Sequence, residues 1–180
     1  VKPEDLLECE NGVYQVGEDV IRDMRKFSQL SVREVIAYSS NIGAVKIAEK
    51  LGRERLYKYI LDFGFGEKTG IDFPSESKGI VYHYKKWYPL TFRTIAFGQG
   101  ISVTMVQIVM ALSAIANGGV LMKPYLAEKI IYPDGSELAL NQPTMVRRVI
   151  SAETAKTMTE LMMEVVSPKG TGYLAQIPGY

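Results

Sequence analysis

The feature that most constrains the fold is a run over residues 94–122 that contains no charged side chain. Its apolar helical part, Val103–Ala116, would reach about 21 Å as an α-helix, short of the roughly 30 Å hydrocarbon core of a membrane. Gln107 and Ser113 interrupt this part, and Asn117-Gly118-Gly119 ends it. The run therefore predicts a buried central helix rather than a membrane span.

Start and stop signals place the other helices. Ser31-Val32-Arg33-Glu34 and Thr104-Met105-Val106-Gln107 are capping boxes, in which the hydroxyl accepts a backbone N–H and the side chain three residues later reaches back. Gly52 is a helix stop. Together with the apolar periodicity, these signals predict helices over residues 32–38, 42–51, 53–63, 103–116 and 151–166.

The remaining pattern predicts a small β element. Residues 13–16 alternate like a short strand, 125–132 and 137–140 form a hairpin around Pro133-Asp134-Gly135, and 144–150 read as another strand. Residues 66–92, the aromatic loop, are expected to be non-helical and pinned to the body by their rings rather than to form a binding surface. We expect a mostly helical α/β fold and a single domain over residues 1–180.

Composition excludes several classes of function. Twenty-one basic against twenty acidic residues give a net charge of +1, so no broad field attracts nucleic acid. One cysteine, Cys9, and one histidine, His83, exclude a disulfide framework and a multi-cysteine or paired-histidine metal site. A cysteine–histidine dyad is formally possible but has no recognisable sequence context. We expect neither a metal nor another cofactor.

Three catalytic-looking strings occur, and two of them lie in unsuitable places. S-x-x-K catalysis needs a helix start, because one helical turn stacks the lysine beside the serine. Ser75-Glu76-Ser77-Lys78 lies between a proline and a glycine, and Lys68-Thr69-Gly70 lies in a turn-rich loop instead of on a strand edge. We predict that both are surface loops, as is Lys169-Gly170-Thr171-Gly172.

The third string, Ser39-Ser40-Asn41, lies at the junction of two predicted helices. Such a junction can hold short polar side chains rigidly toward a cleft. The alternative is that Ser39 or Ser40 merely caps the second helix. The string by itself favours capping, and only its surroundings change that balance.

Those surroundings span nearly the whole chain in the right order. Residues 31–52, SVREVIAYSSNIGAVKIAEKLG, and 59–79, YILDFGFGEKTGIDFPSESKG, resemble the transpeptidase domain of class B penicillin-binding proteins. So do Phe97-Gly98-Gln99-Gly100, the stretch Ala114 to Gly119, and the segment from Gly170 to Tyr180. The fold implied is part of the penicillin-binding protein, serine β-lactamase-like, transpeptidase fold.

The resemblance implies a chemistry. In this family the serine of S-x-x-K attacks a peptidoglycan stem peptide, an amine resolves the acyl-enzyme into a crosslink, and β-lactams trap the same serine. Ser39 would be the catalytic proton relay, and Asn41 would bind the substrate peptide and orient the lysine. Ser40 occupies the variable position and receives no role. Gly98, Gln99 and Gly100 are expected to serve packing at a turn.

The departures from the family pattern are equally specific. The given sequence holds no S-x-x-K string before Ser39, and the family's catalytic K-T-G is expected to follow Tyr180, the last residue given. We therefore expect an internal fragment that is inactive by itself. The parent would be anchored outside the cytoplasmic membrane, on its periplasmic face, through an absent N-terminal segment. It would serve cell division or cell shape, with glycosyltransferase, divisome or elongasome partners. The alternatives are a catalytically silent β-lactam sensor or scaffold, and a helical interaction module.

Overall fold

The computed structural model describes residues 1–177, which divide into two compact units. The first unit holds residues 1–57, 82–101 and the segment from Thr157 onward, and the second holds residues 58–81 and 102–156. Pro178, Gly179 and Tyr180, which end the segment of family resemblance, lie outside the described residues.

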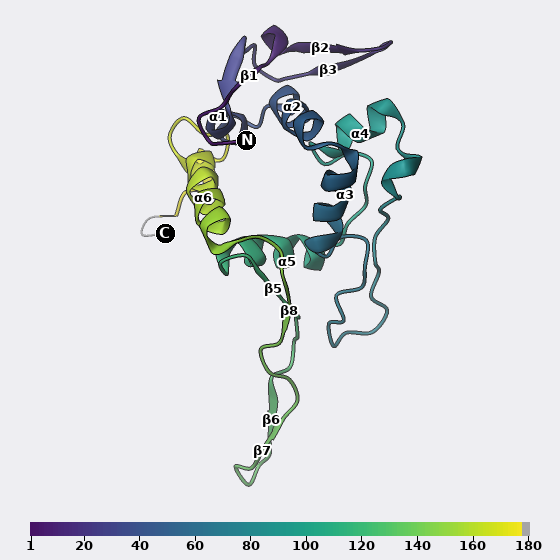
Figure 1. The fold of residues 1–180 in the computed structure, drawn as a ribbon. Coiled ribbons are helices and arrows are strands. Elements are labelled where there is room, and N and C mark those ends of the chain that lie inside the picture. Colours follow the sequence, from purple (N-terminus) through teal and green to yellow (C-terminus); the bar gives the residue numbers. More distant parts are fainter. Residues whose placement is uncertain (178–180) are drawn as a thin grey trace. The chain divides into compact units, whose positions relative to one another are not determined.

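Two small antiparallel sheets begin the first unit (Figure 1). Strand β1 (Leu6–Glu8) pairs with β4 (Gln29–Ser31), and β2 (Val13–Val16) pairs with β3 (Asp19–Arg22). A 3₁₀ turn, Glu10–Gly12, precedes β2. The strand at residues 13–16 was predicted. The other three strands were not, because each is only three or four residues long and gives little periodicity.

Four helices complete most of the first unit: α1 (Val32–Ala37), α2 (Asn41–Leu51), the start of α3 (Arg53–Asp62) and α4 (Pro89–Ile95). The predicted capping box at the start of α1 is present, and α2 ends at Gly52 as predicted. The expectation that residues 66–92 are non-helical is wrong at its end. Pro89 opens α4 from the first helical position, where its missing N–H costs nothing.

The core of this unit forms where α1 and α2 pack against the sheets. Its buried residues come from β1, β3 and β4, from both helices and from the residue after β1: Leu7, Cys9, Ile21, Leu30, Val32, Val35, Ile42 and Val45. In Figure 1 the β2–β3 hairpin lies next to α2. The packed core therefore fixes the junction between α1 and α2.

The second unit contains α5 (Met105–Ala116), the end of α3, the start of α6 (Ala152–Met163) and two β-ribbons. Strand β5 (Val120–Met122) pairs with β8 (Met145–Arg148), and β6 (Lys129–Ile131) pairs with β7 (Glu137–Ala139). The hairpin predicted around residues 133–135 is therefore confirmed. Figure 1 shows the β6–β7 ribbon extending beyond β5 and β8.

The predicted central helix forms with its capping box, but it is only half buried. Met110 and Ala114 pack on Leu121, whereas Met105 and Val109 are 74% and 57% exposed. The expectation of a buried helix therefore holds for one face of α5, which carries Gln107, Met110, Ala111 and Ala114. Uniform apolarity does not say how many faces of a helix are covered. Within residues 1–177, none of the helices combines the length and the apolarity that crossing a bilayer demands.

The aromatic loop is pinned by some of its rings only. Trp87 and Phe92 are buried and stacked with centroids 6.3 Å apart, and the Trp87 indole N–H donates to the Tyr82 carbonyl at 2.8 Å. Phe73, Tyr82 and Tyr88 are exposed. Three further 3₁₀ turns, Tyr84–Lys86, Glu164–Val166 and Tyr173–Ala175, complete the described chain.

Candidate active site

Helix α1 ends in a Schellman motif, which sets the backbone of Ser39. The Ser40 N–H donates to the Val35 carbonyl at 3.0 Å, and the Ser39 N–H donates to the Ile36 carbonyl at 3.3 Å. Ser39 consequently adopts a left-handed backbone with φ 55°. Glycine usually fills this position, and another residue there costs on the order of 1 kcal/mol. The fold alone does not favour serine at this position.

Ser40 is the residue that caps α2. Its hydroxyl accepts the Gly43 N–H at 2.9 Å and donates to the Asp23 carboxylate at 2.6 Å, and that carboxylate also accepts the Ile42 N–H at 3.0 Å. Ser40 is 3% exposed. The capping interpretation of the motif therefore applies to Ser40, and it leaves the hydroxyl of Ser39 available for other contacts.

A close approach at Gly43 holds the two helices together. A Cβ built on Gly43 would lie 2.3 and 2.8 Å from the two γ-carbons of Val35. No side chain can occupy that space without moving α2 away from α1. Glycine at this position therefore keeps the corner between the two helices tight, and with it the spacing of Ser39 and Asn41.

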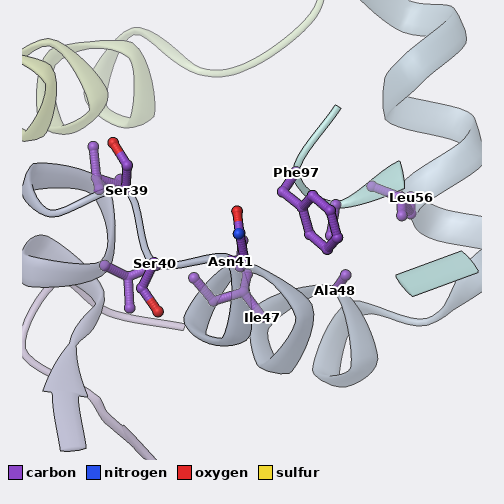
Figure 2. Close-up of a pocket in the computed structure, with 11 residues that line it drawn as sticks. Ser39, Ser40, Asn41, Ile47, Ala48, Leu56 and Phe97 are labelled. Atoms are coloured by element: carbon purple, nitrogen blue, oxygen red, sulfur yellow. The ribbon is translucent and has the colours of Figure 1, made fainter. Parts of the chain in front are cut away.

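The outer two residues of the motif point to the same side of the corner. Figure 2 shows the Ser39 hydroxyl and the Asn41 amide on one side and the Ser40 hydroxyl on the other. The Ser39 Oγ lies 3.0 Å from the Thr171 Oγ1, and the Asn41 amide N–H donates to the Arg22 carbonyl at 3.0 Å. Ser39 is exposed and Asn41 is half-buried.

A cavity of about 470 Å³ opens beside this pair. Its walls are mostly apolar and come from α1, α2, the start of α3 and the segment after α4, with Ser39, Ser40 and Asn41 as the polar lining (Figure 2). Ala44, Ile47, Ala48, Leu56 and Phe97 are among the apolar lining residues. None of the lining residues within the described part of the chain is charged. The cavity therefore offers hydroxyl and amide groups for hydrogen bonding, but the described lining contains no lysine that could deprotonate a serine.

The other motif strings lie where the sequence places them, in loops. Ser75 has a left-handed backbone with φ 63°, and no helix begins there. The Glu76 carboxylate instead accepts the N–H and the hydroxyl of Thr69 and the N–H of Gly70. These contacts hold its pKa below the ordinary value even though burial of the carboxyl raises it. The two strings, Ser75–Lys78 and Lys68–Gly70, thus belong to one loop whose two parts are joined by the hydrogen bonds of Glu76.

The formal cysteine–histidine dyad does not form. Cys9 is fully buried in the core, where burial raises the pKa of its thiol. His83 stacks on Tyr84 and its Nδ1 accepts the N–H of Lys85. Among residues 1–177, no group of three or more histidine, cysteine or acidic residues is arranged to hold a metal ion.

The family-signature turn after α4 requires glycine for its backbone. Gly98 and Gly100 have φ angles of 86° and 85°. A Cβ on Gly100 would lie 3.4 Å from both Ile95 and Thr91, whereas one on Gly98 would meet nothing within 4 Å. The turn explains both glycines, and close packing against α4 concerns Gly100 alone.

Three residues of the site were not predicted from the sequence: Asp23, Phe97 as a cavity wall, and Thr171. The turn Lys169–Gly172 is a loop as expected, but Gly170 is buried and Thr171 contacts Ser39. No local pattern marks Thr171 or Asp23, because each acts on a residue distant in the sequence.

All 180 residues match the family model of the penicillin binding protein transpeptidase domain. The chain therefore belongs to this family, and the resemblance to class B penicillin-binding proteins is confirmed.

Relatives and solved structures agree with this assignment. Stage V sporulation protein D of Bacillus subtilis is 45% identical over 148 residues, covering 82% of this chain and 23% of that protein. The probable peptidoglycan D,D-transpeptidase PenA of Neisseria meningitidis is 28% identical over 167 residues, covering 93% and 27%. This chain spans only about a quarter of these relatives.

Among solved structures, the transpeptidase domain of Burkholderia pseudomallei penicillin-binding protein 3 superposes with a TM-score of 0.88 at 33% identity, covering 100% of this chain and 52% of that one. Penicillin-binding protein 3 of Mycobacterium tuberculosis, complexed with aztreonam, gives a TM-score of 0.86 at 33% identity, covering 99% and 41%. The mostly helical α/β fold expected from the sequence is thereby confirmed.

Proposed function

We propose that this chain is part of a serine D,D-transpeptidase that crosslinks peptidoglycan stem peptides and binds β-lactams. The observation that carries the proposal is the division of labour at residues 39–41. Ser40 caps helix α2, whereas Ser39 and Asn41 present their side chains at the edge of an open cavity. Capping alone would not account for a serine in the left-handed position.

The proposed roles follow from hydrogen-bonding capacity. A serine hydroxyl can accept one proton while donating another, so Ser39 is suited to pass a proton between a base and a leaving amine. The Asn41 amide has two N–H donors and one acceptor oxygen, which suits it to hold a peptide carbonyl. Its present bond to the Arg22 carbonyl occupies one donor and keeps the amide oriented.

The nucleophile is proposed to come from the complete polypeptide outside this sequence. The one S-x-x-K string within it, Ser75–Lys78, has no helix to align its two side chains. The transpeptidase would then act on the outer face of the cytoplasmic membrane, with glycosyltransferase, divisome or elongasome proteins as partners. The name of the PenA relative and the aztreonam complex of the tuberculosis protein support the substrate and inhibitor classes.

Labelling with fluorescent penicillin tests the proposal. We expect no covalent labelling of the 180-residue chain and stable labelling of the full-length gene product. In the full-length protein, Ser39→Ala and Asn41→Ala should each slow acylation by roughly 10²–10⁴-fold, the range for a lost proton-transfer group.

Two outcomes would contradict the proposal. Labelling of the short chain, mapped to Ser75 by mass spectrometry, would identify a different nucleophile. A full-length protein that folds but is never acylated would favour a catalytically silent sensor or scaffold.

A further inference from the structure

The hydroxyl of Thr171 makes the one side-chain hydrogen bond that Ser39 shows among residues 1–177. The two hydroxyl oxygens lie 3.0 Å apart, although the residues are 132 positions apart in the sequence. Both residues are exposed, and Ser39 is among the residues that line the cavity. The contact therefore adds little to the core, and its effect falls on the orientation of the Ser39 side chain.

The turn that carries Thr171 is firmly attached to α1 and to the turn after α6. The Thr171 N–H donates to the Ala37 carbonyl at 3.1 Å, and the Gly172 N–H donates to the Val165 carbonyl at 2.8 Å. A Cβ on Gly170 would lie 2.1 Å from the Val165 carbonyl oxygen. Backbone contacts thus fix the position of Thr171 independently of its side chain.

The hydrogen-bonding capacity of the two hydroxyls allows this contact to run in either direction. Each hydroxyl has one proton, and either can donate across the 3.0 Å contact. The Thr171 Oγ1 has one other acceptor nearby, the Ala37 carbonyl, at a longer 3.5 Å. When Thr171 donates to Ser39, one lone pair of Ser39 is occupied and its own proton is free to point into the cavity.

The backbone conformation of Ser39 does not by itself determine the rotamer of its side chain. The left-handed φ of 55° fixes where the Cα–Cβ bond points, but the hydroxyl can still rotate among three staggered positions. A fixed partner hydroxyl selects one of them. We propose that Thr171 is a positioning residue for Ser39, which holds the relay hydroxyl in its productive rotamer; this inference rests on the proposed transpeptidase function.

The experiment measures acylation of the full-length protein by fluorescent penicillin, as second-order rate constants. Thr171→Val keeps the branched shape and removes the hydroxyl, and it should slow acylation about 3–10-fold, the value of one neutral hydrogen bond. Thr171→Ser keeps the hydroxyl and should stay within about twofold of the parent. Thr154→Val is the matched control, because it breaks a similar exposed pair of hydroxyls, 2.9 Å apart, whose members Ser151 and Thr154 are not among the cavity-lining residues of the described chain.

A double-mutant cycle separates positioning from a merely structural role. If Thr171 acts through Ser39, Thr171→Val should have no further effect in a Ser39→Ala background. A loss of similar size in that background would overturn the inference. So would normal acylation in Thr171→Val when Ser39→Ala is slow.

The acylation rate of Ser39→Ala and the folding of each variant complete the test. If Ser39→Ala itself is acylated normally, the proposed function fails at Ser39 and the inference falls with it. Circular dichroism and thermal melting establish that the variants fold. Should Thr171→Val not fold, Thr171→Ala replaces it, because it leaves the backbone bonds of the turn in place.

Discussion

The Ser40 hydroxyl lies 2.6 Å from the Asp23 carboxylate, and this contact ties the segment after β3 to the start of α2. The same carboxylate accepts the Ile42 N–H. One acidic side chain therefore fixes both the cap of α2 and the backbone beside the cavity. The corner that presents Ser39 and Asn41 depends on a pair of residues that takes no part in the proposed chemistry.

Replacing Ser40 by alanine should therefore cost stability. Loss of the cap and of the Asp23 partner should lower the free energy of unfolding by about 1–3 kcal/mol. Urea denaturation measures the change. Ser151→Ala is the matched control, because Ser151 caps α6 at an exposed position, and its cost should be smaller. Equal costs for the two variants would show that Asp23 adds nothing to the cap.

Replacing Ser39 by glycine should separate stability from function. Glycine adopts the left-handed backbone without strain, so Ser39→Gly should raise the free energy of unfolding by about 0.5–1 kcal/mol. In the full-length protein the same change should slow penicillin acylation as much as Ser39→Ala does. A glycine variant that is destabilised would contradict the strain at this residue, and one that is acylated normally would contradict the role of its hydroxyl.

Replacing Gly43 by alanine should loosen the corner. The added methyl would overlap the γ-carbons of Val35, and overpacking of this kind costs about 1–3 kcal/mol. Val35→Ala removes those carbons, so the double variant should be more stable than the sum of the two single changes predicts. Chemical denaturation of all four proteins gives the coupling energy, and strict additivity would argue against the contact.

Acid should weaken the start of α1. The backbone N–H of Ser31 donates to the Glu34 carboxylate at 2.8 Å, and so does the Ser31 hydroxyl. These two bonds, the backbone bond first, hold the pKa of Glu34 below its ordinary value. Because the folded pKa is the lower one, the stabilisation is present above the unfolded pKa of about 4.3 and is lost as the pH falls through the folded pKa.

The pH dependence of unfolding isolates this contribution. Between about pH 5 and pH 3, Glu34→Gln should flatten part of the decline seen in the parent protein. Glu18→Gln, at an exposed turn between β2 and β3, serves as the control and should keep the parent slope. Identical slopes for the parent and Glu34→Gln would exclude the capping box as a source of acid sensitivity.

The sequence by itself determined the local structure. Helix starts at Ser31 and Thr104, the stop at Gly52 and the turn at residues 133–135 follow from hydrogen bonds and backbone preferences within a few residues. The same short range explains why the loops around Ser75 and Lys68 could be recognised as unsuitable for catalysis. The motif at residues 39–41 was also found as a short string. Its family resemblance rested on segments along nearly the whole chain.

Only the tertiary structure decided which contacts each serine of that motif makes. Ser39 and Ser40 are adjacent and chemically identical, and the sequence distinguishes them only through the family resemblance. Ser39 has a left-handed backbone and contacts Thr171, whereas Ser40 donates to the carboxylate of Asp23 in the segment after β3. These contacts join residues far apart along the chain, and chain folding alone brings them within hydrogen-bond distance.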